Sequence, residues 1–236
     1  DEETGLYYLR SRFYNFSLCR FIDMDCLIHS GNTFAYCCNS PASMHDVCGT
    51  TGDYAYDRDK VIEYGRQYYN KQDPYYPQRS YRNNCVRFAS QCLYAGLGDD
   101  IIAQVYPEWH CYRNNQRDPE NPEEHDQTRS WRKTNYFYRF LMDSGLAYNT
   151  TRLYSGWDLG LMAEWFQYEP GDFLFFSNGN GADEFYHVAV VSAITENDIL
   201  FMGNTTDCFD ASLTAWFQDP ENQEKEVVIV CIADQG

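Results

Sequence analysis

The sequence of 236 residues lacks the features that would direct it to a membrane or to nucleic acid. No stretch approaches the roughly 18 apolar residues of a membrane-spanning helix, and the start Asp1-Glu2-Glu3 is the opposite of a basic signal-peptide start. Residues 153–236 contain one Lys or Arg against 15 Asp or Glu. Because such a field repels phosphates, we expect no nucleic-acid partner. Because no apolar run is long enough, we also expect no membrane insertion. The missing initiator Met suggests a piece of a longer protein.

Patterns for binding metal are also missing. The ten cysteines include no Cys-x-x-Cys pair and no Cys/His cluster with zinc-site spacing. Cys37 and Cys38 are adjacent, and Cys19, Cys26 and Cys48 lie among aromatic residues, where we interpret them as small buried thiols. A disulfide framework stays open as the alternative. We expect no metal and no cofactor.

The composition that remains is that of a globular protein. Hydrophobic residues make up 44% and charged residues 22%, which is enough for one full core and a small annex. The net charge of −17 is uneven: residues 1–50 contribute −3, residues 51–152 contribute 0, and residues 153–236 contribute −14. The acidity therefore belongs to the last third of the chain.

The first 49 residues read as short strands and turns. Residues 4–14, 20–22 and 34–41 are aromatic and β-prone, with alternating polar positions. Because so short a sheet is not stable alone, we expect it to lean on a larger structure. Gly49 and Gly52 indicate a linker, which we place at residues 50–56. A second domain follows at residues 57–236.

This stretch resembles the C-terminal end of the core of Rhs/YD-repeat polymorphic toxins. The resemblance rests on TGLYYLRSRFY at residues 4–14, on Arg20-Phe21-Ile22, and on residues 46–49, which stand where the family has D-P-x-G. Cys19 replaces the family's Gly, and Cys26 its Pro. The resemblance implies an upstream Rhs shell, a toxin payload in the following residues, a cognate immunity protein, and secretion or cell-surface delivery by a bacterium.

Helical periodicity begins after the linker. Asp57 is a good N-cap for an amphipathic helix whose apolar face runs from Val61 to Tyr68. A second helix follows, capped by Asn83 and Asn84, with Gly96 as its stop; its apolar face holds Cys85, Phe88, Ala89, Cys92 and Leu93.

The rest of the domain changes from helix to strand. Residues 112–133 are polar and predict a loop, and Thr134 caps a third helix that ends at Gly145. After Pro170, apolar runs predict strands at residues 172–176, 186–194, 199–202 and 226–232. Helices followed by antiparallel strands predict an α+β fold.

Cys85 is the strongest chemical signal, because it stands in the first turn of a helix. There the free backbone N–H groups and the helix dipole favour the thiolate, the species that attacks carbonyls. The alternative is one more buried thiol, like Cys92. Of the five histidines, His187 alone begins an apolar strand, where a rigid element can hold an imidazole as the base.

A third residue would orient the imidazole, and Asn204 at the end of the strand ILFMG is the candidate. A two-residue turn at 197–198 sets Asn204 opposite Val191 and on the same side as His187, but roughly 13 Å from it. A bulge or a wider loop would therefore have to shift the register. Asp207 and Asn178 stay as alternatives.

The backbone N–H of Cys85 is the natural first donor to an oxyanion, and the side chain of Asn84 or Asn83 is the candidate for the second. We interpret Gln91 as a buried hydrogen-bonding residue. Core packing is the default role for the tryptophans, with lining of a cleft as the alternative: Trp109, Trp131, Trp157 and Trp165.

From residue 57 onward the chain resembles the putative amidase domain family, a distant relative of the CHAP and NlpC-type papain-like peptidases. The matching segments are Tyr56-Asp57-Arg58, NCVRFASQ at residues 84–91, Gly171-Asp172, HVAVV at residues 187–191, and NTTD at residues 204–207. The resemblance implies a papain-like fold, Cys85 as nucleophile, His187 as base and Asn204 in the third place, in a Cys-His-Asn triad.

The function that follows is a cysteine-dependent amidase or peptidase acting as a toxin payload on peptidoglycan peptides. The alternatives are a deamidase or protease for an intracellular protein, and a catalytically inactive papain-fold binding module. A nuclease ranks below them, because the sequence offers no metal-carboxylate cluster and no basic stripe. We expect a thiolate–imidazolium pair, and a preference of the acidic field for amine-bearing substrates or a basic immunity partner.

Overall fold

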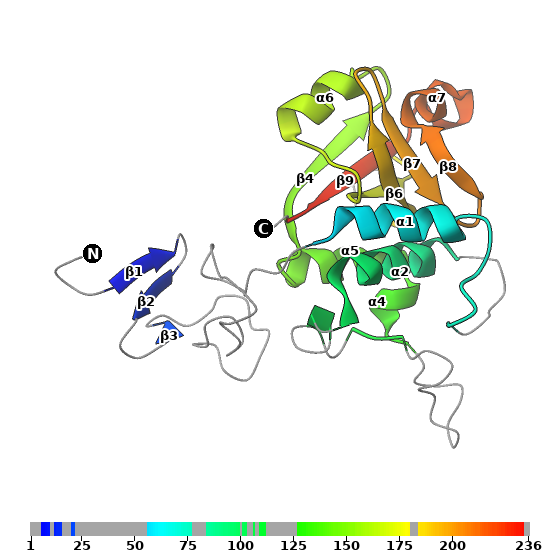
Figure 1. Cartoon of the computed structure of the whole chain (residues 1–236). Coiled ribbons are helices and arrows are strands. Elements are labelled where there is room, and N and C mark those ends of the chain that lie inside the picture. The colour runs from blue at the N-terminus through cyan, green and yellow to red at the C-terminus, as the bar shows by residue number, and fades with distance from the viewer. Residues whose placement is uncertain are drawn as a thin grey trace.

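The computed structural model describes residues 6–9, 12–15, 20–21, 56–76, 84–99, 101–102, 106, 109–111, 127–179 and 184–233 (Figure 1). Near the N-terminus, β1 (Leu6–Leu9), β2 (Arg12–Asn15) and β3 (Arg20–Phe21) form an antiparallel sheet in that order. The strands predicted in residues 4–14 and 20–22 are thereby confirmed. The segment at 34–41 and Asn83 lie outside the described residues.

The larger sheet has six strands in the order β4-β9-β5-β6-β7-β8, and every neighbouring pair is antiparallel. The central strands β5 and β9 are buried along their whole length. The strands are β4 (Ala147–Tyr154), β5 (Phe173–Ser177), β6 (Phe185–Ile194), β7 (Ile199–Gly203), β8 (Cys208–Ser212) and β9 (Glu226–Ile232). The α+β prediction is confirmed.

Helices cover both faces of this sheet (Figure 1). On one face lie α1 (Arg58–Tyr68), α2 (Cys85–Leu97), α4 (Arg129–Arg132) and α5 (Thr134–Asp143), whose apolar residues form one core with alternate residues of β5, β6 and β9. On the other face lie α6 (Leu159–Phe166) and α7 (Leu213–Gln218), which share a second core with the remaining alternate residues. None of the described helices is long and apolar enough to cross a membrane.

The start of α1 is fixed to the sheet by Asp57 and Arg58. Asp57 caps α1 by accepting the N–H of Lys60. Arg58 donates to Asp172 at 3.0 Å and to the carbonyl oxygens of Pro170 and Ile232 at 2.8 Å. These contacts tie the first helix of the domain to β5 and β9, so Arg58 and Asp172 are structural partners.

Tyr56 belongs to the packed domain, although the sequence boundary placed it in the linker. Its side chain is buried, and its hydroxyl donates to the carbonyl of Gly171 at 2.9 Å. Its ring lies so close to Gly96 that a Cβ there would approach a ring carbon to 2.5 Å. Gly96 therefore permits this packing inside α2, and the helix ends instead at Gly98, whose φ of 80° suits glycine.

Several elements differ from the sequence-based prediction. Residues 129–132 form α4 rather than loop, and Thr134 begins α5 with Lys133 as its N-cap. The polar segments that became β4 and β8 carry too few apolar residues to predict a buried strand. Each of them lies at an edge of the sheet, where pairing on one side is sufficient. The short helices α6 and α7 were also not predicted.

Candidate active site

Cys85 is the first residue of α2 and is 4% exposed. Just before it, the backbone N–H of Asn84 donates to the hydroxyl of Thr205 at 3.1 Å, and its side-chain Nδ2 donates to Oδ1 of Asn204 at 2.8 Å. The start of α2 is thus held by the turn that follows β7. These contacts fix the position of the thiol relative to the sheet.

His187 lies near the beginning of β6. Phe176 of β5 faces His187, whereas Ser177 faces Phe185, so Tyr186 is the extra residue of a β-bulge. Because directly opposed residues point to the same face, the imidazole lies on the α7 side of the sheet, where its centroid is 5.4 Å from that of Phe176. The bulge changes the direction of the backbone next to His187.

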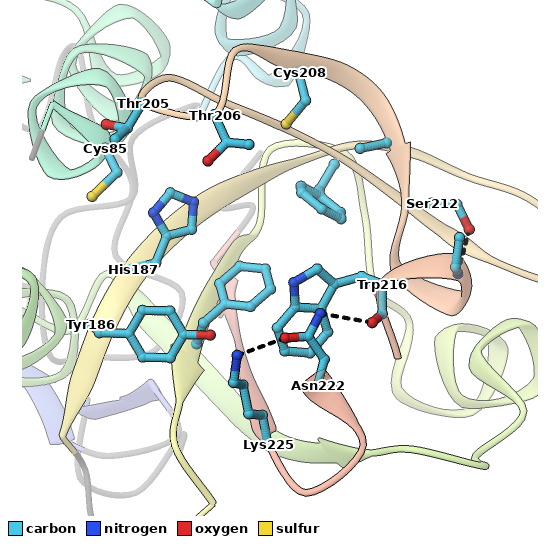
Figure 2. Close-up of a pocket in the computed structure, with 14 residues that line it drawn as sticks. Cys85, Tyr186, His187, Thr205, Thr206, Cys208, Ser212, Trp216, Asn222 and Lys225 are labelled. Atoms are coloured by element: carbon cyan, nitrogen blue, oxygen red, sulfur yellow. Dashed lines mark hydrogen bonds between the residues drawn. The ribbon is translucent and has the colours of Figure 1, made fainter. Parts of the chain in front are cut away.

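The start of α2 can approach His187 because β7 does not extend alongside the first residues of β6. The β6–β7 ladder stops at the pair Val190–Met202. The first residues of β6 pair with β5 but not with β7. This part of β6 faces the start of α2, and the backbone N–H of Val188 is directed at the sulfur of Cys85. Figure 2 shows Cys85 beside His187, and both residues line the same cavity. Two elements that are distant in sequence thereby bring a thiol and an imidazole together.

The two groups open into a cavity of about 680 Å³. Its far side is formed by β7, β8, α7 and the turn before β9 (Figure 2). The lining residues are Cys85, Phe176, Tyr186, His187, Phe201, Thr205, Thr206, Cys208, Ala211, Ser212, Ala215, Trp216, Asn222 and Lys225. The floor is aromatic and apolar, and Lys225 alone of these described lining residues is ordinarily charged at neutral pH.

Burial sets the protonation of the pair. It raises the pKa of the Cys85 thiol above the ordinary value of 9.0, although the N–H groups of Val188, Val86 and Cys85 act in the opposite direction. Burial also lowers the pKa of His187 to about 4. Burial thus favours a neutral thiol and a neutral imidazole in the resting site over the expected thiolate–imidazolium pair.

Asn204 lies on the other side of the sheet from His187. The loop between β6 and β7 is wider than two residues, since Ile194 pairs with Ile199, and a bulge interrupts the ladder between Val191 and Ala193. If this register is continued, Asn204 is level with Val188, which points to the face opposite that of His187. The expectation that Asn204 and His187 share a side is therefore wrong, because the bulge adds a residue.

The amide of Asn204 is fully buried and already bonded. Its Oδ1 accepts from Asn84, and its Nδ2 donates to the carbonyl oxygens of Tyr68 at 3.1 Å and Lys71 at 3.3 Å. Asn204 therefore joins the end of α1 to the start of α2. Its predicted role as the partner of His187 stays a prediction, as do those of Asp207 and Asn178, which are exposed and do not line the cavity.

The nitrogen of His187 on the side of β7 is Nε2, since a Cβ added at Gly203 would lie 3.7 Å from it and 3.7 Å from Sγ of Cys208. Figure 2 shows the hydroxyl of Thr206 turned toward the imidazole from this side. Within the described residues, no hydrogen bond of the His187 ring is recorded. The hydroxyl of Thr206 is therefore our candidate for a hydrogen bond with Nε2 of His187.

The remaining sequence-predicted residues fall outside the cavity. Asn84 points to Asn204, and Gln91 accepts from the hydroxyl of Tyr64 at 3.2 Å, which confirms it as a buried hydrogen-bonding residue. Trp109 and Trp131 are core residues, whereas Trp157 and Trp165 are exposed. The tryptophan that does line the cavity, Trp216, was not predicted, because α7 was not predicted.

In the part of the chain that the structure describes, no group of three or more His, Cys, Asp or Glu side chains is placed to hold a metal ion. Cys85, Cys92 and Cys208 are free thiols, and Cys208 shares the cavity with Cys85.

The fold and the site define an α+β protein with a helix-terminal thiol beside an imidazole in one cavity. The sequence model of the family described as putative amidase domain matches residues 55–228. The chain therefore belongs to this family, which supports amide hydrolysis as its class of activity. No curated protein and no solved structure matches the chain.

Proposed function

We propose that the protein is a cysteine-dependent amide hydrolase with Cys85 as nucleophile and His187 as base. The observation that carries the proposal is the meeting of the two side chains in one cavity, from the first turn of α2 and the start of β6. Such a thiol beside a base is the arrangement of nucleophilic catalysis. Membership of the amidase family supports the same class of reaction.

The first step starts from the neutral pair. As the sulfur of Cys85 attacks the amide carbonyl carbon, His187 takes the proton of the thiol, and a tetrahedral oxyanion forms. The backbone N–H of Cys85, in the first turn of α2, is a donor for this oxyanion, and the positive end of the helix dipole favours the negative charge. The imidazolium then gives its proton to the leaving amine, and a thioester remains.

Water completes the reaction. His187 removes a proton from the water as its oxygen attacks the thioester carbonyl, and the sulfur leaves and recovers the proton. The products are a carboxylic acid and an amine, and both protein groups return to their neutral forms. Because burial disfavours the imidazolium, this ion is transient, and its pKa about 4 makes it a ready proton donor to the leaving group.

The finer part of the proposal concerns fold relationship and biological role. A helix-terminal Cys, a strand His and an antiparallel sheet support a relationship to papain-like and NlpC-type peptidases. The resemblance of residues 4–49 to the Rhs core supports a secreted toxin payload with an immunity partner. Peptidoglycan peptides are the proposed target. We expect the domain to arrest bacterial growth when it is exported from the cytoplasm, and to leave growth unaffected when it stays in the cytoplasm.

The test is hydrolysis of isolated peptidoglycan by the purified protein, followed as new amino groups and identified by mass spectrometry. We expect Cys85→Ala and His187→Ala each to reduce the rate by roughly a thousandfold or more, because each removes a group that acts in every step. Cleavage of proteins but not of peptidoglycan would move the target to an intracellular protein.

The matched control is Cys92→Ala, because Cys92 is a fully buried thiol of the same helix that does not line the cavity. We expect this variant to hydrolyse at the wild-type rate per folded molecule. Full activity of Cys85→Ala would contradict cysteine catalysis. Binding of peptidoglycan peptides without any hydrolysis would instead identify an inactive binding module.

A further inference from the structure

One cation stands out against the acidic end of the chain. Lys225 is the single Lys or Arg among residues 153–236, which contain 15 Asp or Glu. It lies in the turn before β9 and lines the same cavity as Cys85 and His187 (Figure 2). The only Lys or Arg of this long acidic segment is thus placed where the proposed substrate would bind.

Lys225 is held in position by neutral groups. Its Nζ donates to Oδ1 of Asn222 at 2.7 Å and lies 5.7 Å from the ring centre of Tyr186 and 5.9 Å from that of Trp216. Asn222 is itself buried, and its Nδ2 donates to the carbonyl of Trp216 at 3.0 Å. The ammonium of Lys225 is thus held by one amide oxygen and lies against two aromatic rings.

No protein carboxylate neutralises this charge within the part of the chain that the structure describes. The recorded ion pairs do not include Lys225, and its neighbour Glu226 is paired with Arg152. The described lining of the cavity contains no Asp or Glu. Since an ammonium has three N–H donors and Asn222 takes one, Lys225 retains capacity to donate to an anion.

We propose that Lys225 forms a carboxylate-binding subsite of this cavity. This inference rests on the proposed amide hydrolysis and narrows its substrate to amides that carry a carboxylate apart from the bond that is cleaved. The apolar part of such a substrate lies along Phe176, Phe201 and Trp216, and the carboxylate accepts from Nζ of Lys225.

This subsite reverses the expectation drawn from net charge. The acidic last third predicted a preference for amine-bearing substrates, but the cavity presents a cation and no described carboxylate. Local groups at contact distance act more strongly on a bound ligand than screened charges spread over the surface. The substrate preference therefore follows from Lys225 rather than from the overall charge.

The test compares reagents that alkylate Cys85 and differ only in one charge. Chloroacetyl-glycine, chloroacetyl-diglycine and chloroacetyl-triglycine are each paired with the corresponding C-terminal amide, so that the carboxylate is offered at increasing reach. The readout is the ratio of the acid rate to the amide rate, measured by mass spectrometry on the peptide that contains Cys85. Because alkylation needs no hydrolysis, the ratio is independent of the proposed catalytic activity.

We expect Lys225→Met to lower this ratio roughly tenfold for at least one reach, the size of a charge-assisted hydrogen bond, and Lys225→Arg to keep most of it. Lys133→Met, which removes an exposed charge that does not line the cavity, is the control for net charge. An unchanged ratio in Lys225→Met, or an equal fall in Lys133→Met, would overturn the subsite. Equal slowing of acid and amide reagents would also do so, because it reports a change in cavity shape only.

The failure of each proposal is distinguishable. A carboxylate preference that depends on Lys225, in a protein that hydrolyses no amide, would leave the subsite standing and remove the hydrolase. Hydrolysis that needs Cys85 and His187 but shows no charge preference would do the reverse.

Discussion

At the scale of single residues, burial acts on the reacting pair in opposite senses. It raises the pKa of Cys85 above 9.0 and lowers that of His187 to about 4, so both groups are neutral at pH 7. The start of α2 contributes only roughly half an elementary charge, which does not offset the burial of the thiol. The proton must therefore move from sulfur to nitrogen during attack on the substrate.

The neutral pair predicts how Cys85 responds to pH. Its alkylation by iodoacetamide should be slow at pH 7 and should accelerate only above pH 9, because the thiolate reacts and a raised pKa delays its formation. The measurement is the labelling rate of the Cys85 peptide across pH. A fast, constant rate between about pH 5 and pH 8 would instead show a thiolate–imidazolium pair. His187→Gln is the control, since its profile should match that of the wild type when the pair is neutral.

Asn204 and Thr206 allow the third role to be assigned. Asn204→Ala should cost about 2 kcal/mol of unfolding free energy, because it removes the hydrogen bonds that the Asn204 amide makes with the side chain of Asn84 and with the carbonyls of Tyr68 and Lys71. Thr206→Val should keep stability and reduce hydrolysis roughly tenfold if the hydroxyl orients His187. Urea unfolding and hydrolysis per folded molecule are the two measurements.

Thr206→Ser is the matched control, because it keeps the hydroxyl and should keep the rate. If Asn204→Ala abolished hydrolysis while leaving stability and the position of α2 intact, Asn204 would be the orienting residue that the sequence predicted. If Thr206→Val were fully active, the hydroxyl would have no catalytic role.

At the scale of elements, the contacts between the start of α1 and the segment before β5 hold the helix layer on the sheet. Arg58 of α1 bonds to Asp172 before β5 and to the carbonyl of Ile232 in β9. Asp172 also accepts the backbone N–H groups of Glu169 and Ile232. This network joins the first helix to two central strands, and it lies outside the cavity lining. These residues therefore position the fold on which the site is built.

Breaking these contacts predicts a loss of stability. Asp172→Ala should lower the unfolding free energy by about 3 to 5 kcal/mol, because it removes the buried carboxylate partner of the largely buried guanidinium of Arg58 and leaves two backbone donors without their acceptor. Thermal and urea unfolding measure the effect. Glu169→Gln is the control: its carboxylate also contacts Arg58 but is half exposed, so its loss should cost less than about 1 kcal/mol. Equal losses in the two variants would contradict the assignment.

At the scale of the whole molecule, the cavity exists because the layers end at different places. The sheet separates two cores, with α2 on one face and α7 on the other. Where β7 stops, the start of α2 reaches the edge of β6, and α7 with the turn before β9 supplies the opposite wall. The aromatic floor and Lys225 come from this second layer. The cavity therefore has a positively charged side chain in its wall, although the last third of the chain is acidic.

The sequence by itself determined the parts of this protein that depend on local pattern. Apolar periodicity located α1, α2 and the buried strands β5, β6, β7 and β9, and it predicted Cys85 and His187 as the reacting pair, which the fold brings into one cavity. Edge strands and short helices escaped it, because β4, β8, α6 and α7 are stabilised by their neighbours rather than by their own composition.

Tertiary structure alone decided what surrounds that pair. The bulge between Val191 and Ala193 sends Asn204 to the other face, since one extra residue reverses the side on which every later side chain lies. Burial, which no spacing reveals, makes the resting pair neutral. Lys225 could be seen in the sequence as a single cation, but only the tertiary arrangement of α7, the turn before β9 and β6 places it in the cavity of the nucleophile.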